Sequence, residues 1–507
     1  MKILFIDPQG MQQPVKNKPS IGLNRAIATL APILVKRGHQ VSVIDMVNHY
    51  FDNITDTIKN SLNVFKPDLI GISILNAQYN NALNIIKILR EITDIPIITG
   101  GAEVTAIEEK IFNETDFAIN VSVLGEGEET IVKIVECFEK KDMTLLEGIK
   151  GIIINRNNKI IKTGSTQMVE DLNKYPFPDF GIYGVRRLNF YKIMGSRGCP
   201  FKCSFCFSYL GSSWREREPK NVIRELEEAK EKFGFHMFRF LDPVFNFRIA
   251  WVHEICDAII KSSLYGLPWE VPAMRADKCN DDIFKHMVDA GCKRVGIGVE
   301  SLHPEVFKLI KKGETIDQLK NSVRLATKYF RRVLVSMVIG LPGDTKERCL
   351  YSYNELKKLK PTDLSYALAV PYSGTRMEKW AEESAQILGS SYDSFTRGSL
   401  GFNSGIAFET EDFTKEERLE TFKIINTKEF KYVSKSEFHR FLNPMAWLRD
   451  AFKYDKNNYC KHVLFVSDQI YSRFANKQKR LFYDTKLPPI EYERIPDGTW
   501  WVGNGNA

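Results

Sequence analysis

Three cysteines with metal-ligand spacing stand in the middle of the chain, at Cys199, Cys203 and Cys206, in the pattern C-x-x-x-C-x-x-C. Thiolates this close along the chain can converge on one metal centre without ligands from elsewhere. A closed structural zinc site needs four ligands, and this stretch offers no second C-x-x-C pair and no nearby histidine. A four-iron cluster held by three thiolates leaves one iron open to a small molecule. The spacing therefore favours an iron–sulfur cluster over zinc.

The remaining cysteines are isolated, and the total of nine is odd. A secreted disulfide framework would be small, with a dense and even set of cysteines. We therefore predict a reducing, cytoplasmic environment with one group of functional thiols. The isolated cysteines are Cys137, Cys256, Cys279, Cys292, Cys349 and Cys460.

Strand and helix signals alternate after the three cysteines. In the helix-like run 218–233, apolar residues recur every three or four positions, and Gly234 ends the run. Six such βα units predict a partial parallel barrel, whose site lies at the carboxyl ends of the strands. The strand-like runs are 191–196, 236–242, 269–275, 293–300, 332–342 and 363–371.

Polar residues and glycines stand at those predicted strand ends. Asp242, Arg275, Glu300 and Gly340 are the candidates for a binding site there. Each polar one also has a structural interpretation: Asp242 as part of a turn, Arg275 as a surface ion pair, Glu300 as a helix cap. Taken one at a time, the two interpretations are equally supported.

A second alternating pattern precedes the barrel, over residues 1–165. Apolar, β-branched runs at 2–7, 40–45, 68–73 and 95–101 are typical of buried parallel strands. This predicts a doubly wound, Rossmann-like α/β domain with its ligand beyond the carboxyl ends of the strands. Glycines follow several of these strands, but the first strand lacks a G-x-G-x-x-G, which argues against a dinucleotide. Alone, such glycines favour tight turns.

The cysteine spacing, with Phe205 before the third cysteine, resembles the radical S-adenosylmethionine (SAM) superfamily. The resemblance implies a [4Fe-4S] cluster whose open iron binds the methionyl part of SAM and whose electron cleaves SAM to a 5′-deoxyadenosyl radical. It also implies that Phe205, Asp242, Arg275, Glu300 and Gly340 bind SAM. The matching stretches include 214–217, 240–242, 275–277, 296–301 and 340–343.

The first domain resembles cobalamin-binding domains. Ser73 and Leu75 match an S-x-L motif, and Gly100-Gly101 matches a G-G motif. The resemblance implies that these residues seat the dimethylbenzimidazole tail of cobalamin. The resemblance also implies that Gly125 and Glu126, in a G-E-G-E stretch, help bind cobalamin.

One departure from the cobalamin pattern concerns the cobalt. The D-x-H-x-x-G motif that would place a histidine below the metal is absent, and Gln9 stands where the histidine would be. Gln9 is therefore the candidate at the lower face, although a neutral amide is a poor ligand beside imidazole.

Composition limits the remaining possibilities. The chain has 507 residues, with 71 Lys plus Arg against 63 Asp plus Glu, and no basic stripe that would indicate nucleic-acid binding. No apolar run approaches the roughly 18–20 residues of a transmembrane helix, and the start reads as a strand rather than a signal peptide. We predict a cobalamin-binding domain (1–165), a linker (166–190), a radical SAM barrel (191–385) and a small, mainly helical C-terminal domain (386–507) that could cap the substrate.

The resemblance implies an enzyme that methylates an unactivated carbon of a small molecule or natural product. The deoxyadenosyl radical would take a hydrogen atom from the substrate, methylcobalamin would supply the methyl group, and a flavodoxin- or ferredoxin-type protein would supply electrons. One alternative is a radical SAM cyclase, oxidase or ring-rearranging enzyme that uses cobalamin without methyl transfer. Another is a non-catalytic cobalamin or redox sensor.

Overall fold

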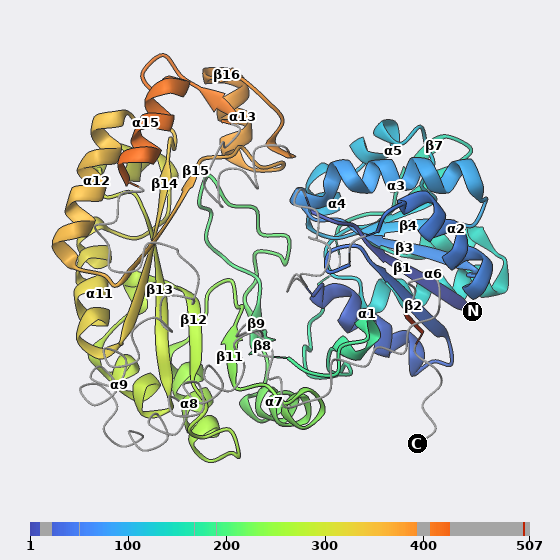
Figure 1. Cartoon of the computed structure of the whole chain (residues 1–507), viewed down its shortest axis with the longest axis horizontal. Coiled ribbons are helices and arrows are strands. Elements are labelled where there is room, and N and C mark those ends of the chain that lie inside the picture. The colour runs from blue at the N-terminus through green and yellow to red at the C-terminus, as the bar shows by residue number, and fades with distance from the viewer. Residues whose placement is uncertain are drawn as a thin grey trace.

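The computed structural model describes residues 1–10, 23–49, 51–166, 168–188, 190–392 and 406–425, and the backbone of residues 500–501. Two parallel sheets, each with its own helices, lie side by side (Figure 1). None of the described helices is both long and apolar enough to cross a membrane.

The first sheet has the order β18-β2-β1-β3-β4-β5-β6-β7. Its five neighbouring strands β2, β1, β3, β4 and β5 run parallel. The order 2-1-3-4-5 is that of a doubly wound fold, as the sequence predicts. Two further strands, β6 and β7, extend the sheet, with β6 antiparallel to β5. The strands are β1 (Lys2–Asp7), β2 (Gln40–Asp45), β3 (Leu69–Ser73), β4 (Ile97–Gly100), β5 (Val121–Val123), β6 (Ile152–Arg156), β7 (Lys159–Lys162) and β18 (Trp500–Trp501).

Helices cover both faces of this sheet, because its strands carry apolar side chains on both sides. One face packs against α2 and α3, and the other packs against α1 and α6. Asn24 starts α1 by accepting a hydrogen bond from the backbone N–H of Ala26 at 3.0 Å. The helices are α1 (Arg25–Val35), α2 (Ile54–Phe65), α3 (Tyr79–Ile92), α4 (Ala102–Ile107), α5 (Lys110–Glu114) and α6 (Glu128–Lys140).

The second sheet has six parallel strands in the order β15-β14-β13-β12-β11-β8, which is the predicted partial barrel. Its strands are β8 (Phe190–Ile193), β11 (Met237–Phe240), β12 (Trp269–Met274), β13 (Cys292–Glu300), β14 (Arg332–Ile339) and β15 (Asp363–Leu368). Its helices are α7 (Pro219–Phe233), α8 (Ile249–Ile260), α9 (Asp281–Asp289), α10 (Pro304–Ile310), α11 (Ile316–Tyr329), α12 (Lys346–Leu359) and α13 (Arg376–Ser384).

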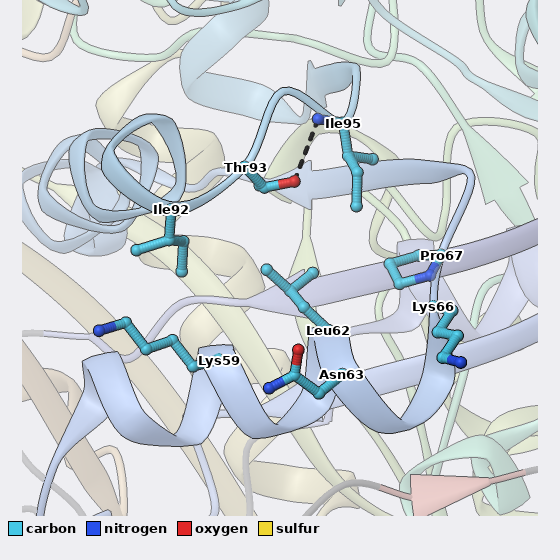
Figure 2. Close-up of a pocket in the computed structure, with 8 residues that line it drawn as sticks. All are labelled: Lys59, Leu62, Asn63, Lys66, Pro67, Ile92, Thr93 and Ile95. Carbon is cyan, nitrogen blue, oxygen red and sulfur yellow. Dashed lines mark hydrogen bonds between the residues drawn. The ribbon is translucent and has the colours of Figure 1, made fainter.

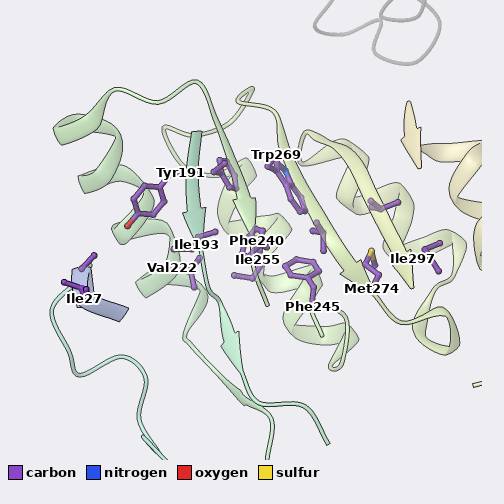
Figure 3. Close-up of a cluster of buried hydrophobic side chains, with 14 of the residues drawn as sticks. Ile27, Tyr191, Ile193, Val222, Phe240, Phe245, Ile255, Trp269, Met274 and Ile297 are labelled. Atoms are coloured by element: carbon purple, nitrogen blue, oxygen red, sulfur yellow. The ribbon is translucent and has the colours of Figure 1, made fainter. Parts of the chain in front are cut away.

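The core of the barrel continues into the first domain. Phe240, Phe245 and Trp269 pack together, with the rings of Phe240 and Phe245 4.7 Å apart (Figure 3). The same buried cluster includes Tyr191 of β8 and Ile27 of α1. The two domains therefore share apolar contacts and are not connected by the linker alone.

A buried ion pair reinforces this junction. Glu225 of α7, with a side chain only 1% exposed, lies 2.8 Å from the guanidinium of Arg25 at the start of α1 and 2.5 Å from that of Arg217. Tyr191 donates to the same carboxylate at 2.8 Å. Burial alone would raise the pKa of Glu225, but the two arginines hold it below its usual value.

The segment between the domains also packs closely. A short 3₁₀ turn, η3 (Phe180–Tyr183), follows Asp179, whose backbone N–H donates to the carbonyl of Ala28 in α1. The buried Tyr183 hydroxyl donates to Asp7 at 3.3 Å. The predicted linker is thus part of the folded interface.

The described part of residues 386–507 lies against both domains. The ribbon β16 (Gln386–Ile387) and β17 (Phe408–Glu409) leads to α15 (Lys415–Ile425), which packs against α12 and β14. Trp500–Trp501 pairs antiparallel with β2 in the first sheet, a position that the sequence analysis did not predict. Residues 393–405, 426–499 and 502–507, to which most of the predicted cap belongs, lie outside the described residues.

Candidate active site

The carboxyl ends of the two sheets approach each other. A β-carbon at Gly374, which follows β15, would stand 3.5 Å from the carbonyl of Ala106 in α4. Tyr392 stacks on Tyr79 of α3 with 4.2 Å between ring centroids and donates to Glu103 of α4 at 2.9 Å. Both contacts join the carboxyl side of the barrel to that of the first sheet.

The three predicted cluster cysteines lie on one loop with a narrow neck. A two-residue antiparallel ribbon, β9 (Ser196–Arg197) and β10 (Arg215–Glu216), closes residues 198–214 into this cluster loop. Gly198 has φ +84°, and a β-carbon there would overlap the carbonyl oxygen of Ser213. Only glycine fits this position, directly before Cys199.

The thiols of this loop are more exposed than four of the other described cysteines, although Cys279 is half-buried as well. Cys206 is exposed and Cys199 and Cys203 are half-buried, whereas Cys137, Cys256, Cys292 and Cys349 are buried. The loop nevertheless desolvates the sulfur of Cys206, and this burial, together with the neighbouring thiols, raises its pKa to about 11. A thiolate here needs a cation, and an iron centre would supply one.

The arrangement of these thiols fits a cluster better than a single ion. Within the described residues, no three His, Cys, Asp or Glu side chains stand close enough to share one metal ion. In a [4Fe-4S] cluster each cysteine binds a different iron, so the sulfurs stand further apart than the ligands of one zinc ion. Cys199, Cys203 and Cys206 therefore remain the predicted ligands of such a cluster.

Asp242, at the end of β11, holds the base of the cluster loop. Its carboxylate accepts hydrogen bonds from the Ser196 hydroxyl at 2.6 Å and from the Gly195 backbone N–H at 3.1 Å. Burial raises its pKa to about 6 despite these bonds. Asp242, which is predicted to bind SAM, therefore has hydrogen-bond partners within the protein, and these bonds fix the start of β9.

Arg275 and Glu300 lie at the ends of β12 and β13, as predicted. The Arg275 guanidinium stands 3.3 Å from the ring centroid of Phe201, in the cluster loop, and its Nε donates to Asp277 at 2.8 Å. Glu300 adopts φ +63° where the β13 register shifts, and its carboxylate accepts from Ser336 at 3.0 Å. A strained non-glycine backbone beside a strand end is typical of a functional position.

The sequence analysis missed two residues between them. Lys312 is buried, and its ammonium lies 3.4 Å from Glu300 and 3.5 Å from Glu314. The buried Oε2 of Glu314 has no hydrogen-bond partner within the described residues. Both residues follow α10 rather than a strand, so a search of strand ends could not find them.

The two remaining SAM candidates, Phe205 and Gly340, differ in their surroundings. Phe205 is partly buried in the cluster loop. Gly340 has φ +85°, and a β-carbon there would overlap the guanidinium of Arg418 in α15. The described C-terminal helix therefore packs directly against the loop that follows β14.

The predicted cobalamin residues gather at the carboxyl edge of the first sheet. The Ser73 hydroxyl accepts from Asn24 at 3.1 Å, and Leu75 is 44% exposed although it is a large apolar residue. Gly101 has φ +111°, and a β-carbon there would stand 2.6 Å from the carbonyl of Ile74; Gly100 precedes it. An exposed leucine beside a bare glycine turn suits a large, neutral, partly apolar ligand such as the cobalamin tail.

A buried carboxyl lies behind this edge. Asp7 and Asp45 are cross-strand partners at the ends of β1 and β2. Burial, together with the charge of Asp45, raises the pKa of Asp7 to about 7, against hydrogen bonds from Asn24, Gln78 and Tyr183. Asp7 therefore holds its proton to a higher pH than an ordinary carboxyl does.

Gln9 lies two residues after this carboxyl, and its carbonyl accepts from the Asn81 side chain at 3.0 Å. Gly125 has φ +74° after β5. Glu126 differs from the other cobalamin candidates, because its carboxylate faces the barrel and contacts Arg197 and Arg215.

A pocket away from these edges lies between α2 and α3, with a volume of about 600 Å³ (Figure 2). Lys59, Lys66, Ile92 and Ile95 are among the residues that line it. Because Lys66 precedes β3 and Ile95 precedes β4, the pocket opens at the amino ends of these strands, away from the candidate site.

A doubly wound domain set edge to edge with a partial barrel that carries a three-cysteine loop is the arrangement expected of a radical enzyme with a second cofactor domain. Comparison with protein families agrees. Residues 193–356 match the radical SAM superfamily, and residues 15–135 match the B12 binding domain. The chain belongs to the cobalamin-binding radical SAM enzymes, and its cofactors are a [4Fe-4S] cluster, SAM and cobalamin.

Several known proteins resemble the whole arrangement. An uncharacterized methyltransferase of Pyrococcus horikoshii is 29% identical over 78% of this chain and 86% of its own length. An anaerobic magnesium-protoporphyrin IX monomethyl ester cyclase of Cereibacter sphaeroides is 24% identical, over 67% of this chain and 58% of its own. The radical SAM methyltransferase TsrM of Kitasatospora setae has the same fold, with a TM-score of 0.68 and 17% identity over 94% of this chain and 99% of its own.

Proposed function

We propose that this enzyme transfers a methyl group to an unactivated carbon of a small molecule. The observation that carries the proposal is the approach of the two carboxyl edges, which would bring a radical source and a methyl source to one space. The similarity to an uncharacterized methyltransferase over most of both chains supports it. When bound, the cluster and SAM supply a radical and cobalamin supplies the methyl group.

In this proposal each edge has its own task. Cys199, Cys203 and Cys206 hold the cluster, while Arg275 and Glu300 orient the charged groups of SAM. Ser73, Leu75, Gly100 and Gly101 seat the cobalamin tail. The packed junction around Glu225 keeps water out from one side, which protects a radical from side reactions.

Two parts of the proposal concern the surroundings of the enzyme. The exposed Cys206 leaves one side of the cluster loop accessible, which suits electron delivery by a flavodoxin- or ferredoxin-type protein. The free thiols of the described cysteines agree with a cytoplasmic location.

A labelling experiment tests the proposal. The reconstituted enzyme is incubated under reducing conditions with methyl-labelled SAM and a metabolite extract. We expect labelled product, S-adenosylhomocysteine and 5′-deoxyadenosine together, because one SAM donates the methyl group and another gives the radical. The Cys203→Ala variant should form neither product nor deoxyadenosine.

The similarity to the magnesium-protoporphyrin ester cyclase supports a second candidate. A cyclase or rearranging enzyme of this fold would form 5′-deoxyadenosine without carrying the label into its product. Deoxyadenosine with an unlabelled product would therefore favour this function over methylation. Formation of no deoxyadenosine at all would favour a sensor.

A further inference from the structure

The neck of the cluster loop carries a charge conflict. Arg197 and Arg215 are direct cross-strand partners in the ribbon of β9 and β10, which is only two residue pairs long. Like charges directly opposite each other destabilise a strand pair. The ribbon therefore needs an anion from outside.

Glu126 of the cobalamin domain is that anion. Its two carboxylate oxygens accept from the Arg215 guanidinium at 2.7 and 3.1 Å, and one of them also accepts from Arg197 at 3.2 Å. The backbone N–H of Val169, in the connecting segment, donates to the same carboxylate at 2.5 Å. The Glu126 side chain is 1% exposed, so these partners replace water almost completely.

The contact is stronger than a surface ion pair. The side chains of Arg197 and Arg215 are 19% and 13% exposed, and Glu128 adds a second carboxylate 2.7 Å from Arg197. Burial opposes the charge of Arg197, yet Glu128 and Glu126 raise its pKa above the ordinary value. Arg215 also donates to the carbonyls of Val169 and Leu210, at 2.5 and 2.7 Å, and Leu210 lies inside the cluster loop.

We propose that Glu126 is a positioning residue that clamps the cluster loop to the cobalamin domain and thereby fixes the separation of the two cofactors. Two carboxylates hold the neck, one from each domain: Asp242 from the barrel and Glu126 from the cobalamin domain. Because Glu126 belongs to the turn between β5 and α6, any shift of the cobalamin domain is passed to both arginines. This inference rests on the proposed cofactor sites but not on methyl transfer.

The test uses the reconstituted holoenzyme and three variants. Glu126→Gln removes the charge but keeps the shape. Glu129→Gln is the matched control, since Glu129 stands in the adjoining helix α6 and pairs with Lys174 of the same connecting segment at 2.5 Å on the surface. In the double variant Glu126→Gln/Arg215→Gln, one of the two opposing arginines is also removed.

The readout is the distance between the reduced cluster and Co(II), measured by pulsed dipolar electron paramagnetic resonance. We expect narrow distributions in the wild type and Glu129→Gln, and a distribution about twofold wider in Glu126→Gln, because a loosened loop samples several positions. The distribution of the double variant should be narrower than that of Glu126→Gln, because the repulsion between the two arginines is gone. A merely structural role would lower stability without this narrowing.

Hydrogen exchange of the apo protein gives a second readout that needs no cofactor. Backbone N–H groups of the neck, such as those of Cys199 and Arg217, should exchange faster in Glu126→Gln than in Glu129→Gln. Should Glu126→Gln fail to fold, Glu126→Asp keeps the charge with a shorter reach and should widen the distribution in the same way.

The inference is overturned if Glu126→Gln gives a distance distribution as narrow as that of Glu129→Gln. Methyl transfer is tested separately: in a true methyltransferase, methylated product per deoxyadenosine should fall about tenfold in Glu126→Gln. If the wild type forms no methylated product, the proposed function fails while the distance measurement still decides the role of Glu126.

Discussion

The carboxyl edges of the two parallel sheets present opposite chemistry. The edge of the first sheet offers a hydroxyl, an exposed leucine and a glycine turn, at Ser73, Leu75 and Gly101. A deeply buried carboxyl beside them, Asp7, has a pKa raised to about 7 by burial and by Asp45. Ser73, Leu75 and Gly101 carry no charge, so we call the part of the edge that they form the neutral edge, although Asp45 and Glu103 lie on the same side of the sheet.

The edge of the barrel carries full charges of both signs. Arg275 pairs with Asp277, and Lys312 lies between Glu300 and Glu314. Charges taken out of water need partners, and a charged ligand can take the place of one of them. The difference suits the two cofactors, because SAM carries charged groups whereas the tail of cobalamin is a neutral ring.

The largest effect is expected at the thiols of the barrel edge. Cys203→Ala removes one of three cluster ligands, so reconstituted protein should fall from about four irons per chain to almost none. Cobalamin binding should persist, because the first sheet is untouched. Iron analysis and the visible spectrum check both expectations.

The matched control is Cys137→Ala, which removes a buried thiol from α6. It should keep its iron. Formation of 5′-deoxyadenosine by Cys203→Ala would show that these cysteines do not hold the cluster.

The neutral edge should be most sensitive at Gly101. Alanine there would place a β-carbon 2.6 Å from the Ile74 carbonyl at φ +111°, so the turn must move. We expect a stability loss of about 1–3 kcal/mol and loss of cobalamin binding, with the cluster retained. Cobalamin binding is measured by absorbance after gel filtration.

The control variant Gly38→Ala distinguishes the effect of backbone strain from the effect of a lack of space for the β-carbon. Gly38 has φ +85°, but nothing described lies within 4 Å of the position that a β-carbon would take. Its alanine variant should lose about 1 kcal/mol and bind cobalamin normally. Equal cobalamin loss in both variants would mean that the Gly101 turn is not part of the binding site.

The strands and the cysteine loop could be predicted because their signals are local. The runs 2–7 and 40–45 are continuous and apolar, and they form β1 and β2 with those bounds. The spacing of the cysteines also places them on one loop. Arg275 and Glu300 could be named as candidates because they stand at predicted strand ends, and parallel strands bring their carboxyl ends to one edge.

The connections between the domains could not be predicted in the same way. Glu126 lies 71 and 89 residues before its partners Arg197 and Arg215, and nothing in the local pattern joins them. Lys312 follows a helix, and the pairing of Trp500–Trp501 with β2 joins opposite ends of the chain. Such contacts depend on the packing of whole domains.

A smaller effect is expected from Glu300→Gln at the charged edge. The substitution removes the charge that faces Lys312 and keeps a group that can bond to Ser336. Losing one charge-assisted hydrogen bond should weaken SAM binding about tenfold, with cobalamin binding unchanged. Calorimetric titration with SAM measures this.

The control for Glu300→Gln is a half-buried ion pair elsewhere in the same domain. Glu355 contacts Lys320 and Lys358, each at 2.5 Å, and these bonds lower its pKa to about 2. Glu355→Gln should leave SAM binding unchanged. An unchanged SAM affinity in Glu300→Gln would remove this residue from the proposed SAM site.

The last prediction concerns the pH dependence that the neutral edge imposes on stability. The folded protein holds the Asp7 proton up to a pKa of about 7, whereas the unfolded chain releases it near the ordinary value of 3.8. Between these values the folded state binds the extra proton, so this group lowers stability by about 1.4 kcal/mol per pH unit as the pH rises. Above pH 7, Asp7 is ionised in both the folded and the unfolded protein, so it no longer contributes to the pH dependence of stability. Asp7→Asn should therefore lose less stability than the wild type between pH 5 and pH 7.

Urea unfolding of the apo protein at several pH values measures this slope. Asp45 also has a raised pKa, mainly from burial, and lies 3.8 Å from His49. Because Asp45 and Asp7 repel each other, Asp7→Asn removes this repulsion and should lower the Asp45 pKa, which reduces the slope of the variant further in the same direction. Tyr183 stays protonated throughout, because burial and Asp7 raise its pKa well above the ordinary value. Parallel stability curves for wild type and Asp7→Asn would mean that Asp7 is ionised in the folded protein. The first edge would then be charged as the barrel edge is, and the contrast between the two cofactor sites would not hold.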